Sequence, residues 1–376
     1  MVLMMSLVAA ESVCIGHPDK FCDVVSDRIV DLVLASDAEA HVAVDCLATT
    51  GFVALTGEID AIDPPSPADL EAIVRDQARR LGHQDGSGFD PDSLEVLCRV
   101  TFAKRAKGPD PDRHKADDQG MMFGFACDET EALMPAAIHH CHRLTEWAST
   151  MWGQGVRADG KVQATLVIGA DGRPARLDQL VMNLQHDPSR LALTDLQNLC
   201  RQHALSSLPK DWITSDSKLL LNPKGDKPKG GPDGDCGMTG RKITVDTYGG
   251  ACPHGGGAFS GKSPGKLDRT GAYAARWIAR NIVAAGLARK AMVQLAYVMG
   301  QPMPAAIMVE SFGTEDSPKL RLAEIVSALV DLRPAALRDR LQLDRPIYEP
   351  TAAFGHFGRV AKNGLFPWEQ NDLNLS

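Results

Sequence analysis

Residues 41–59 read HVAVDCLATTGFVALTGEI, and residues 66–82 read SPADLEAIVRDQARRLG. The first stretch predicts two successive strands, and the second predicts a helix. Ser66 is the expected N-cap of that helix, Pro67 falls in its first turn, and Gly82 is the expected stop signal. The predicted structural unit is therefore two strands followed by one helix.

The same pattern occurs twice more along the chain. Residues 161–185 (KVQATLVIGADGRPARLDQLVMNLQ) predict two strands with a hairpin turn at Asp171-Gly172, and residues 193–205 (LTDLQNLCRQHAL) predict the following helix. Residues 290–313 (KAMVQLAYVMGQPMPAAIMVESFG) and 319–332 (KLRLAEIVSALVDL) repeat this order. Strand pairs followed by single helices indicate an α+β fold, with helices on one face of antiparallel or mixed sheets.

The composition excludes several classes of protein. The 376 residues are 44% hydrophobic and 23% charged, with a net charge of −8 and no long basic run, so nucleic-acid binding is not expected. Nine cysteines without a C-x-x-C pair indicate reduced thiols and a cytoplasmic protein. No apolar run is long enough for a membrane span, and the apolar start lacks the basic residues of a signal peptide.

Two long polar stretches are expected to be loops. Residues 104–120 (KRAKGPDPDRHKADDQG) are rich in charge and proline, and residues 222–240 (NPKGDKPKGGPDGDCGMTG) are rich in glycine and proline. Loops of this length inside a compact domain are usually functional or disordered. A solvated connector is the alternative for each.

Residues 16–20 read GHPDK and precede a predicted helix. His17 and Asp19 would then lie at a helix N-terminus, where free N–H groups and the helix dipole attract anions. Asp19 could instead be a first-turn cap, and His17 a solvated or hydrogen-bonded histidine.

Residues 230–250 read GGPDGDCGMTGRKITVDTYGG. Arg241 and Lys242 follow a glycine-rich loop and stand at the start of a predicted strand, KITVDTY (residues 242–248). Cations beside flexible backbone suit a polyphosphate ligand. Asp235 adds a carboxylate to the same loop, or serves as a turn residue.

Residues 252–268 read CPHGGGAFSGKSPGKLD, with five glycines, Lys262, Lys266 and a closing Asp268. Bare backbone N–H groups beside two ammonium groups indicate a phosphate cradle. The segment is not a Walker loop, because no strand leads directly into its formally matching glycine–lysine spacing.

Five stretches together resemble the signatures of the S-adenosylmethionine synthetase (methionine adenosyltransferase) family. They are GHPDK, DDQGMMFGFACDET, GGPDGDCGMTGRKITVDTYGG, PHGGGAFSGKSPGKLDRTGAYAARWIARNIVAAGL and TAAFGHFGR, and they run in order from about Glu11 to Trp368. The resemblance implies that methionine sulfur attacks the 5′ carbon of ATP, that the triphosphate leaves, and that it is hydrolysed to pyrophosphate and phosphate. A strongly anionic leaving group calls for preorganised cations.

The resemblance also implies three similar domains in a pseudo-threefold arrangement and a homodimer with shared active sites, or a dimer of two such dimers. Its expected segments are an N-terminal domain, a mobile active-site loop, a central domain and a C-terminal domain at 7–103, 104–120, 121–236 and 237–370.

The matching positions carry the implied roles. His17 corresponds to the histidine beside the departing bridging oxygen, and Asp19 and Asp268 correspond to ligands of two Mg²⁺ ions. The implied polyphosphate-binding residues are Lys161, Arg241, Lys242, Lys262 and Lys266. The positions implied to lie near adenosine or methionine are Glu58, Asp118, Asp159, Asp235 and Ala258, and Glu58 would meet the methionine amino group.

Three departures from the family pattern leave alternatives open. The active-site loop is shorter and lacks a Gln-Ser-x-Asp-Ile type stretch, Asp45 replaces the usual glutamate of the potassium site, and Asp226 and Lys227 stand where an aromatic residue usually meets adenine. We therefore expect weak potassium dependence and looser nucleotide discrimination. A paralogue with altered nucleotide or thioether specificity, a weakly active regulatory subunit, and a generic ATP hydrolase or kinase remain the alternatives.

Overall fold

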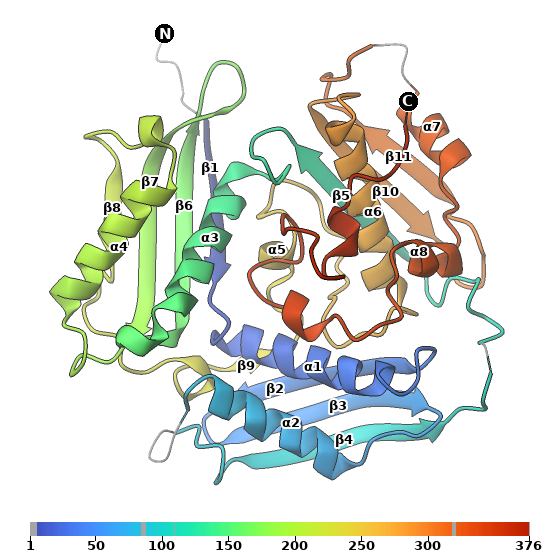
Figure 1. The fold of residues 1–376 in the computed structure, drawn as a ribbon, viewed down its shortest axis with the longest axis horizontal. Helices are drawn as coiled ribbons and strands as arrows, with labels where there is room; N and C mark the ends of the chain where they lie inside the picture. Colours follow the sequence, from blue (N-terminus) through green and yellow to red (C-terminus); the bar gives the residue numbers. More distant parts are fainter. Residues whose placement is uncertain (1–5, 84–87, 109, 318–320, 376) are drawn as a thin grey trace.

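A computed structural model describes residues 6–83, 88–108, 110–317 and 321–375. The described residues form three sheets, each with helices on one face, arranged around a common centre near helix α5 (Ile243–Asp246) (Figure 1). The α+β class with three similar units is therefore confirmed.

The first unit is a four-stranded sheet covered by two helices (Figure 1). Its elements are α1 (Pro18–Leu34), β2 (His41–Thr49), β3 (Phe52–Ala61), α2 (Pro67–Arg80), β4 (Glu95–Lys104) and β9 (Gly237–Met238). β2 and β3 form an antiparallel hairpin, and β4 returns parallel to β3 after α2. The expected cap is confirmed, because Ser66 and Asp69 form a reciprocal capping box and Gly82 follows the helix with φ of +76°.

The second unit repeats this order. Its elements are β1 (Ser6–Val13), α3 (Ala136–Thr150), β6 (Val156–Ile168), β7 (Pro174–His186), α4 (Leu193–Ser207) and β8 (Lys218–Leu221). β6 and β7 form the predicted hairpin around Asp171-Gly172, and β8 runs parallel to β7 after α4.

The third unit lacks the parallel return strand in the described residues. Its elements are β5 (Gly120–Cys127), α6 (Leu267–Ala284), β10 (Lys290–Tyr297), β11 (Ala306–Glu310), α7 (Leu322–Leu329) and α8 (Pro334–Arg340). The expected helix at 319–332 is confirmed as α7, and Lys319 and Leu320 lie outside the described residues. Short 3-10 helices lie at Trp152–Gln154, Lys210–Trp212, Gly231–Asp233, Glu349–Thr351 and Pro367–Glu369.

Each sheet takes one strand from outside its own repeat. β1 precedes the first repeat but pairs with β6 of the second, β5 precedes the second repeat but pairs with β10 of the third, and β9 precedes the third repeat but pairs with β2 of the first. The three sheets are thus linked in a closed cycle. The domain ranges expected from the sequence remain a proposal, and the sheets cross their boundaries.

One predicted strand is wrong. Residues 242–248 form no strand, and residues 243–246 instead make the short helix α5, in which the Asp246 N–H bonds to the Lys242 carbonyl at 2.8 Å. The alternating β-branched residues indicated a strand, but burial of the Asp246 carboxylate against the buried Lys20 ammonium holds a helical turn there. Arg241 and Lys242 therefore precede a helix instead of opening a strand.

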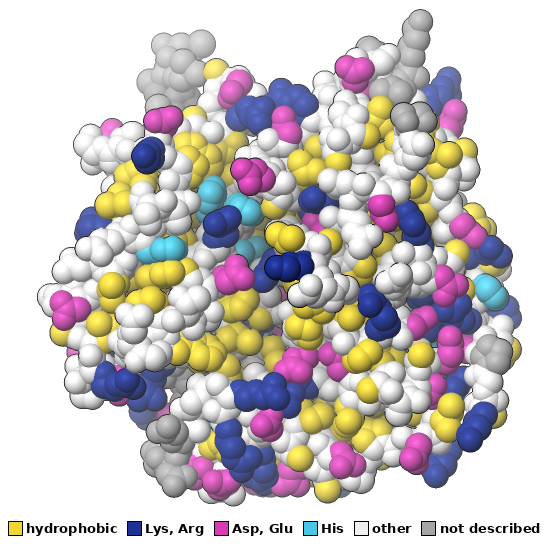
Figure 2. All heavy atoms as spheres, viewed as in Figure 1, with side chains coloured by type: hydrophobic (Ala, Val, Ile, Leu, Met, Phe, Trp, Pro, Cys, Tyr) yellow, Lys and Arg dark blue, Asp and Glu magenta, His cyan; other side chains and the backbone are white. Residues whose placement is uncertain are grey.

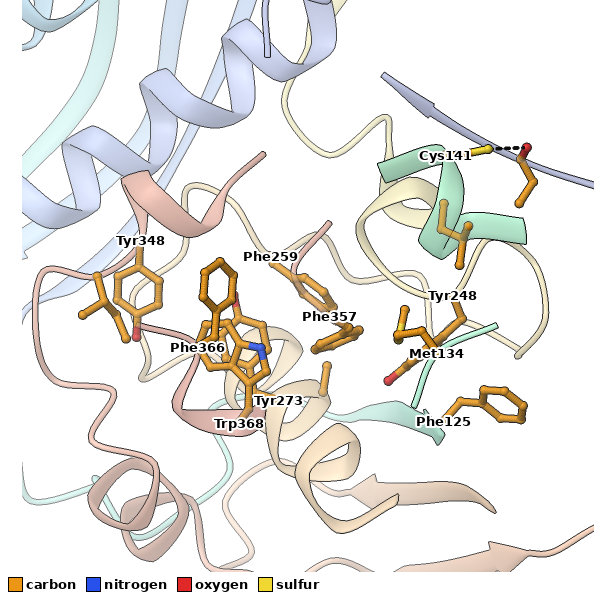
Figure 3. Packing of buried hydrophobic residues seen from close by; sticks show 14 of the residues in the cluster. Phe125, Met134, Cys141, Tyr248, Phe259, Tyr273, Tyr348, Phe357, Phe366 and Trp368 are labelled. Atoms are coloured by element: carbon orange, nitrogen blue, oxygen red, sulfur yellow. Dashed lines mark hydrogen bonds between the residues drawn. The ribbon is translucent and has the colours of Figure 1, made fainter. Parts of the chain in front are cut away.

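Aromatic side chains pack where α6 meets the C-terminal segment (Figure 3). Trp368 stacks on Tyr273 with 3.7 Å between ring centroids, and Phe357 stacks on Tyr248 at 5.1 Å. Phe259, from the glycine-rich stretch, meets Tyr273 and Phe357 edge-on. This cluster anchors the glycine-rich stretch to the core.

The helix-free face of each sheet carries exposed apolar side chains. Their register places them opposite the buried, helix-facing positions of their sheets. They are Leu7, Leu97, Met121, Leu220, Met238 and Met308. On the face shown in Figure 2, basic and acidic side chains are interspersed without a continuous basic surface. No helix within the described residues has the length and apolar character needed to cross a membrane.

Candidate active site

His17 is the N-cap of helix α1 and directly precedes its first residue, Pro18. The His17 Nδ1 accepts the Asp19 N–H at 3.2 Å, so the neutral ring carries its proton on Nε2. Burial lowers the pKa of His17 to about 4, although the nearby Asp159 carboxylate opposes this shift. At neutral pH the ring is therefore an uncharged hydrogen-bond donor at Nε2.

Asp19 gathers three donors in the first turn of α1. Its Oδ2 accepts from Lys242 Nζ at 2.6 Å and its Oδ1 accepts from the Met238 N–H at 3.0 Å, while Arg241 lies 3.6 Å away. Burial raises the pKa of Asp19, but the contacts with Lys242 and Met238 outweigh it and leave the pKa below its ordinary value. Asp19 is thus an ionised carboxylate that draws two cations to the helix N-terminus.

Asp159, on β6, extends this group from the second unit. Its Oδ2 accepts from Lys227 Nζ at 2.8 Å and from the Gly231 N–H at 3.2 Å. Asp159 and Lys227 both act electrostatically on His17. We call His17, Asp19, Asp159, Lys227, Arg241 and Lys242 the α1 cluster.

The two residues expected at the base are held by other protein groups. Lys227 bonds to Asp159, and Asp226 lies 3.1 Å from Nε2 of the buried His186. Both polar ends already have a protein partner, so a base would have to compete with these partners.

A second group of charges lies at the start of α6. The Lys262 ammonium pairs with the Asp268 carboxylate in the first turn of this helix. Burial raises the pKa of Asp45, on β2, and Lys262 opposes this rise, so these two groups also interact. We call Asp45, Lys262 and Asp268 the α6 cluster.

Three of the five glycines in residues 252–268 are required by contacts with the protein itself. A Cβ atom would lie 1.7 Å from the Met121 carbonyl oxygen at Gly255, 2.1 Å from Asp268 Oδ1 at Gly257 and 2.2 Å from the Val44 carbonyl oxygen at Gly261. The sequence predicted that these glycines open the backbone to a ligand. Here they let the loop lie close against β2, β5 and α6.

A buried ion pair that the sequence did not predict lies next to the backbone of Lys262. Arg269 makes two bonds to the Asp27 carboxylate at 2.7 and 2.8 Å and donates to the Lys262 carbonyl at 2.7 Å. Asp27 also accepts the Gly261 N–H at 2.9 Å. Both side chains are fully buried, so α1 and α6 together fix the backbone that carries Lys262. No local sequence pattern could reveal this pair.

A second buried network supports the α1 cluster. Lys20 pairs with Asp23 at 2.8 Å and with Asp246, and it donates to the Ala352 carbonyl at 3.0 Å. Asp23 accepts the Gly240 N–H at 2.9 Å. The network ties α1 to α5 and to the loop before Arg241.

Five other predicted site residues make no side-chain hydrogen bond or ion pair with either cluster within the described residues. Lys161 pairs with Glu11 at 2.6 Å, and Asp118 and Asp235 are exposed and accept the N–H of the next residue. Ala258 lies against Gly240, where a Cβ would be 2.6 Å away. Glu58 is exposed on β3, opposite Ala43.

The two clusters are separate within one chain. In the described ranges, no hydrogen bond or ion pair joins a charged side chain of the α1 cluster to one of the α6 cluster. Asp45, Glu58 and Lys161 lie on helix-free sheet faces, since they alternate with buried helix-facing positions. A cavity of about 530 Å³ between β1 and the turn at 249–251 includes none of the predicted site residues.

Asp19 and Asp268 provide the hard carboxylate oxygens that Mg²⁺ prefers. The described residues contain no ready-made group of three His, Cys, Asp or Glu side chains for a metal ion. One carboxylate in each cluster fits an ion whose remaining ligands are water and substrate phosphate oxygens. The residues present are therefore compatible with Mg²⁺ bound together with a nucleotide.

Three family models match the chain in order. They describe the N-terminal, central and C-terminal domains of S-adenosylmethionine synthetase and match residues 5–103, 113–227 and 229–370.

Curated relatives match almost the whole chain. An S-adenosylmethionine synthase 2 from Rhodospirillum rubrum is 45% identical over 98% of this chain and 96% of its own length. S-adenosylmethionine synthases from Zymomonas mobilis and Maridesulfovibrio salexigens are 44% and 46% identical, over 98% and 96% of this chain and 96% and 94% of their own lengths.

Proposed function

Because this chain belongs to the S-adenosylmethionine synthetase family, we propose that it transfers the adenosyl group of ATP to methionine at a site built from the α1 and α6 clusters. The observation that carries this proposal is the match of all three domain models, in order, over nearly the full chain. The cation-rich clusters supply the chemistry that the reaction needs.

In this reaction the methionine sulfur attacks the 5′ carbon of ATP. The bond between that carbon and the bridging oxygen breaks, its electron pair leaves with the triphosphate, and a sulfonium product forms. Water then cleaves the tripolyphosphate to pyrophosphate and phosphate. Negative charge grows on the bridging oxygen during the first step, so preorganised donors at that oxygen accelerate the reaction.

The charge of each residue indicates its role in this reaction. His17 donates from Nε2 to the bridging oxygen, since its Nδ1 is occupied by the Asp19 N–H. Arg241, Lys242, Lys262 and Lys266 bind the phosphate oxygens, and Lys161 extends this set. Mg²⁺, held through Asp19 and Asp268, neutralises phosphate charge when it is bound. The family resemblance assigns Glu58, Asp118, Asp159, Asp235 and Ala258 to adenosine or methionine.

We further propose that the complete site forms between two copies of the chain. No hydrogen bond or ion pair joins the charged side chains of the two clusters in the described part of one chain, and Asp45, Glu58 and Lys161 lie on the same helix-free faces as the exposed apolar side chains. A second copy covering these faces would bury the apolar surface and bring the α1 cluster of one chain to the α6 cluster of the other. A dimer of such dimers is compatible with this arrangement.

The base specificity and the potassium site stay predictions. Asp226 and Lys227 lack a flat aromatic surface for adenine, and Asp45 is one methylene shorter than the usual glutamate. Product formation with ATP, GTP, CTP and UTP, and with potassium or sodium, tests both. A cytoplasmic location is proposed from the nine cysteines, all of which are free of disulfides.

The direct test incubates the purified protein with ATP, methionine, Mg²⁺ and potassium. We expect a sulfonium product by mass spectrometry, with one pyrophosphate and one phosphate released for each product. Phosphate release without the sulfonium product would favour a generic hydrolase, and neither product would favour a regulatory subunit.

A further inference from the structure

We infer that Asp117, to which no role has been assigned, is a positioning residue for the phosphate-binding end of helix α6. This inference rests on the proposed function and names a residue that supports it. Helix α6 has no cap from its own N-cap residue, because Lys266 makes no side-chain bond to the first turn. Instead, Oδ1 of Asp117 accepts the Leu267 N–H at 3.0 Å from 150 residues away in the sequence.

The same carboxylate meets the lysine that is expected to bind phosphate. Asp117 Oδ2 lies 3.7 Å from Lys266 Nζ, and the two side chains are 24% and 30% exposed. One side chain thus holds both a free N–H of the helix and the ammonium group beside it. A carboxylate suits this place, since the N-terminus of a helix carries partial positive charge.

The backbone beneath Asp117 is itself fixed. The Ala116 N–H donates to the Gln301 carbonyl at 2.9 Å, and the Gly300 N–H donates to the Ala116 carbonyl at 2.9 Å. The adjacent Asp118 turns to its own neighbour, the Gln119 N–H. Asp117 therefore joins the turn at 298–301 to α6, which carries Asp268 in its first turn.

Two substitutions separate the cap from the charge. Asp117→Asn keeps an oxygen that can accept the Leu267 N–H but removes the negative charge beside Lys266. Asp117→Ala removes both. Because the two variants have the same charge, any difference between them reports the cap. The probe is inorganic tripolyphosphate without metal, and its affinity is measured by isothermal titration calorimetry.

We expect Asp117→Asn to bind tripolyphosphate about two- to five-fold more tightly than wild type, because a competing carboxylate is gone. We expect Asp117→Ala to bind about ten-fold more weakly than Asp117→Asn, because only the Ala variant loses the cap that holds the start of α6 in place. The KM for ATP should follow these affinities, and the KM for methionine should stay unchanged.

Hydrogen exchange provides a readout that does not depend on ligand. The Leu267 amide should exchange faster in Asp117→Ala and at the wild-type rate in Asp117→Asn. Asp92→Ala is the matched control, because Asp92 is an exposed aspartate that pairs with the exposed Arg79 outside both clusters and outside the 104–120 loop. Equal affinity and equal exchange in the Ala and Asn variants would overturn the role of Asp117, whereas wild-type protein that makes no sulfonium product would overturn the proposed function.

Discussion

At the scale of single residues, the cations expected to bind phosphate are already paired with carboxylates. Lys242 holds Asp19, Lys262 holds Asp268, and Lys266 lies beside Asp117. Such pairs keep long, flexible lysines in place while no substrate is bound. The same carboxylates compete with the substrate for the lysine ammonium groups. A polyphosphate carries more charge than one carboxylate, so it displaces these partners.

The first prediction concerns Lys262. We expect Lys262→Ala to reduce turnover by about 10²–10³-fold, the range for losing one preorganised donor to developing charge, with the fold retained. Steady-state formation of the sulfonium product measures this, and circular dichroism checks the fold. The control is Lys362→Ala, at an exposed lysine outside both clusters. A Lys262→Ala enzyme with the wild-type rate would remove this residue from the mechanism.

The second prediction separates the two half-reactions at His17. Its Nε2–H serves the bridging oxygen, which matters when the carbon–oxygen bond breaks. We therefore expect His17→Ala to slow sulfonium formation by about 10²-fold or more while hydrolysis of added tripolyphosphate changes far less. His203→Ala, at a histidine that stacks on Trp147 outside both clusters and outside the 104–120 loop, is the control. Equal losses in both reactions would instead indicate a structural role for His17.

At the scale of elements, helix α6 and the glycine-rich loop behave as one support. Gly257 and Gly261 let the loop approach α6 and β2, and Arg269 reaches back from α6 to the Lys262 carbonyl. The loop is thus held by packed elements on both sides. This fixes the position of its Lys262, as a phosphate-binding site requires.

The third prediction tests the buried pair that joins α1 to α6. Arg269→Met leaves the Asp27 carboxylate without its partner, so we expect a loss of about 3–5 kcal/mol in the free energy of unfolding. The double variant Arg269→Met, Asp27→Leu should recover part of that loss, because no unpaired charge stays buried. Urea-induced unfolding measures both. A double variant less stable than Arg269→Met alone would contradict this account.

At the scale of the whole molecule, the cyclic strand exchange joins the three units. Each of β1, β5 and β9 leaves its own repeat and completes a neighbouring sheet. The α1 cluster lies at the start of α1, which directly follows the exchanged strand β1. The α6 cluster lies at the start of α6, which packs on the exchanged strand β5. The exchange thereby places each cluster where two units meet.

The fourth prediction concerns acid stability. Burial lowers the pKa of five histidines, to about 4 or well below their ordinary value: His17, His139, His140, His142 and His356. Because their folded pKa values lie below the unfolded value, the unfolded state binds more protons between about pH 6.5 and 4, and stability falls as the pH falls through that window. Burial raises the pKa of Asp31 and Asp246 to about 7, so these two carboxyl groups take up protons in the folded state and add stability as the pH falls. They are fewer than the five histidines, so the loss of stability dominates.

The urea midpoint of unfolding should therefore decrease from pH 7 to pH 5. His140→Phe should make this decrease less steep, because the unfolded state then takes up about one proton fewer than in the wild type. The substitution removes one titrating group and keeps an aromatic ring against Trp212. A midpoint that rises toward pH 5 would contradict the assignment of these histidines as neutral in the folded state.

The fifth prediction tests whether the site is shared between two copies. His17→Ala lies in the α1 cluster and Lys262→Ala in the α6 cluster, so each variant alone should be nearly inactive. Mixed dimers place both wild-type clusters together in one of their two sites, and random mixing should restore about a quarter of the wild-type rate. Mixtures that stay inactive after subunit exchange would place both clusters in a site formed by one chain.

Features that depend on neighbouring residues could be predicted from the amino-acid sequence. The three repeats of two strands and a helix, the Ser66 cap and the helix after His17 all follow from periodicity and capping, which act over a few residues. The family stretches then assigned most of the candidate site residues, and that assignment stays a proposal here.

Features that rest on contacts between distant residues became visible only in the folded molecule. The turn at α5 replaced a predicted strand because Asp246 is buried against Lys20, which lies 226 residues earlier. Arg269 meets Asp27 across 242 residues, and Asp117 reaches Leu267 across 150. No periodicity or local propensity encodes such pairs, because their energy exists only once the units have packed together.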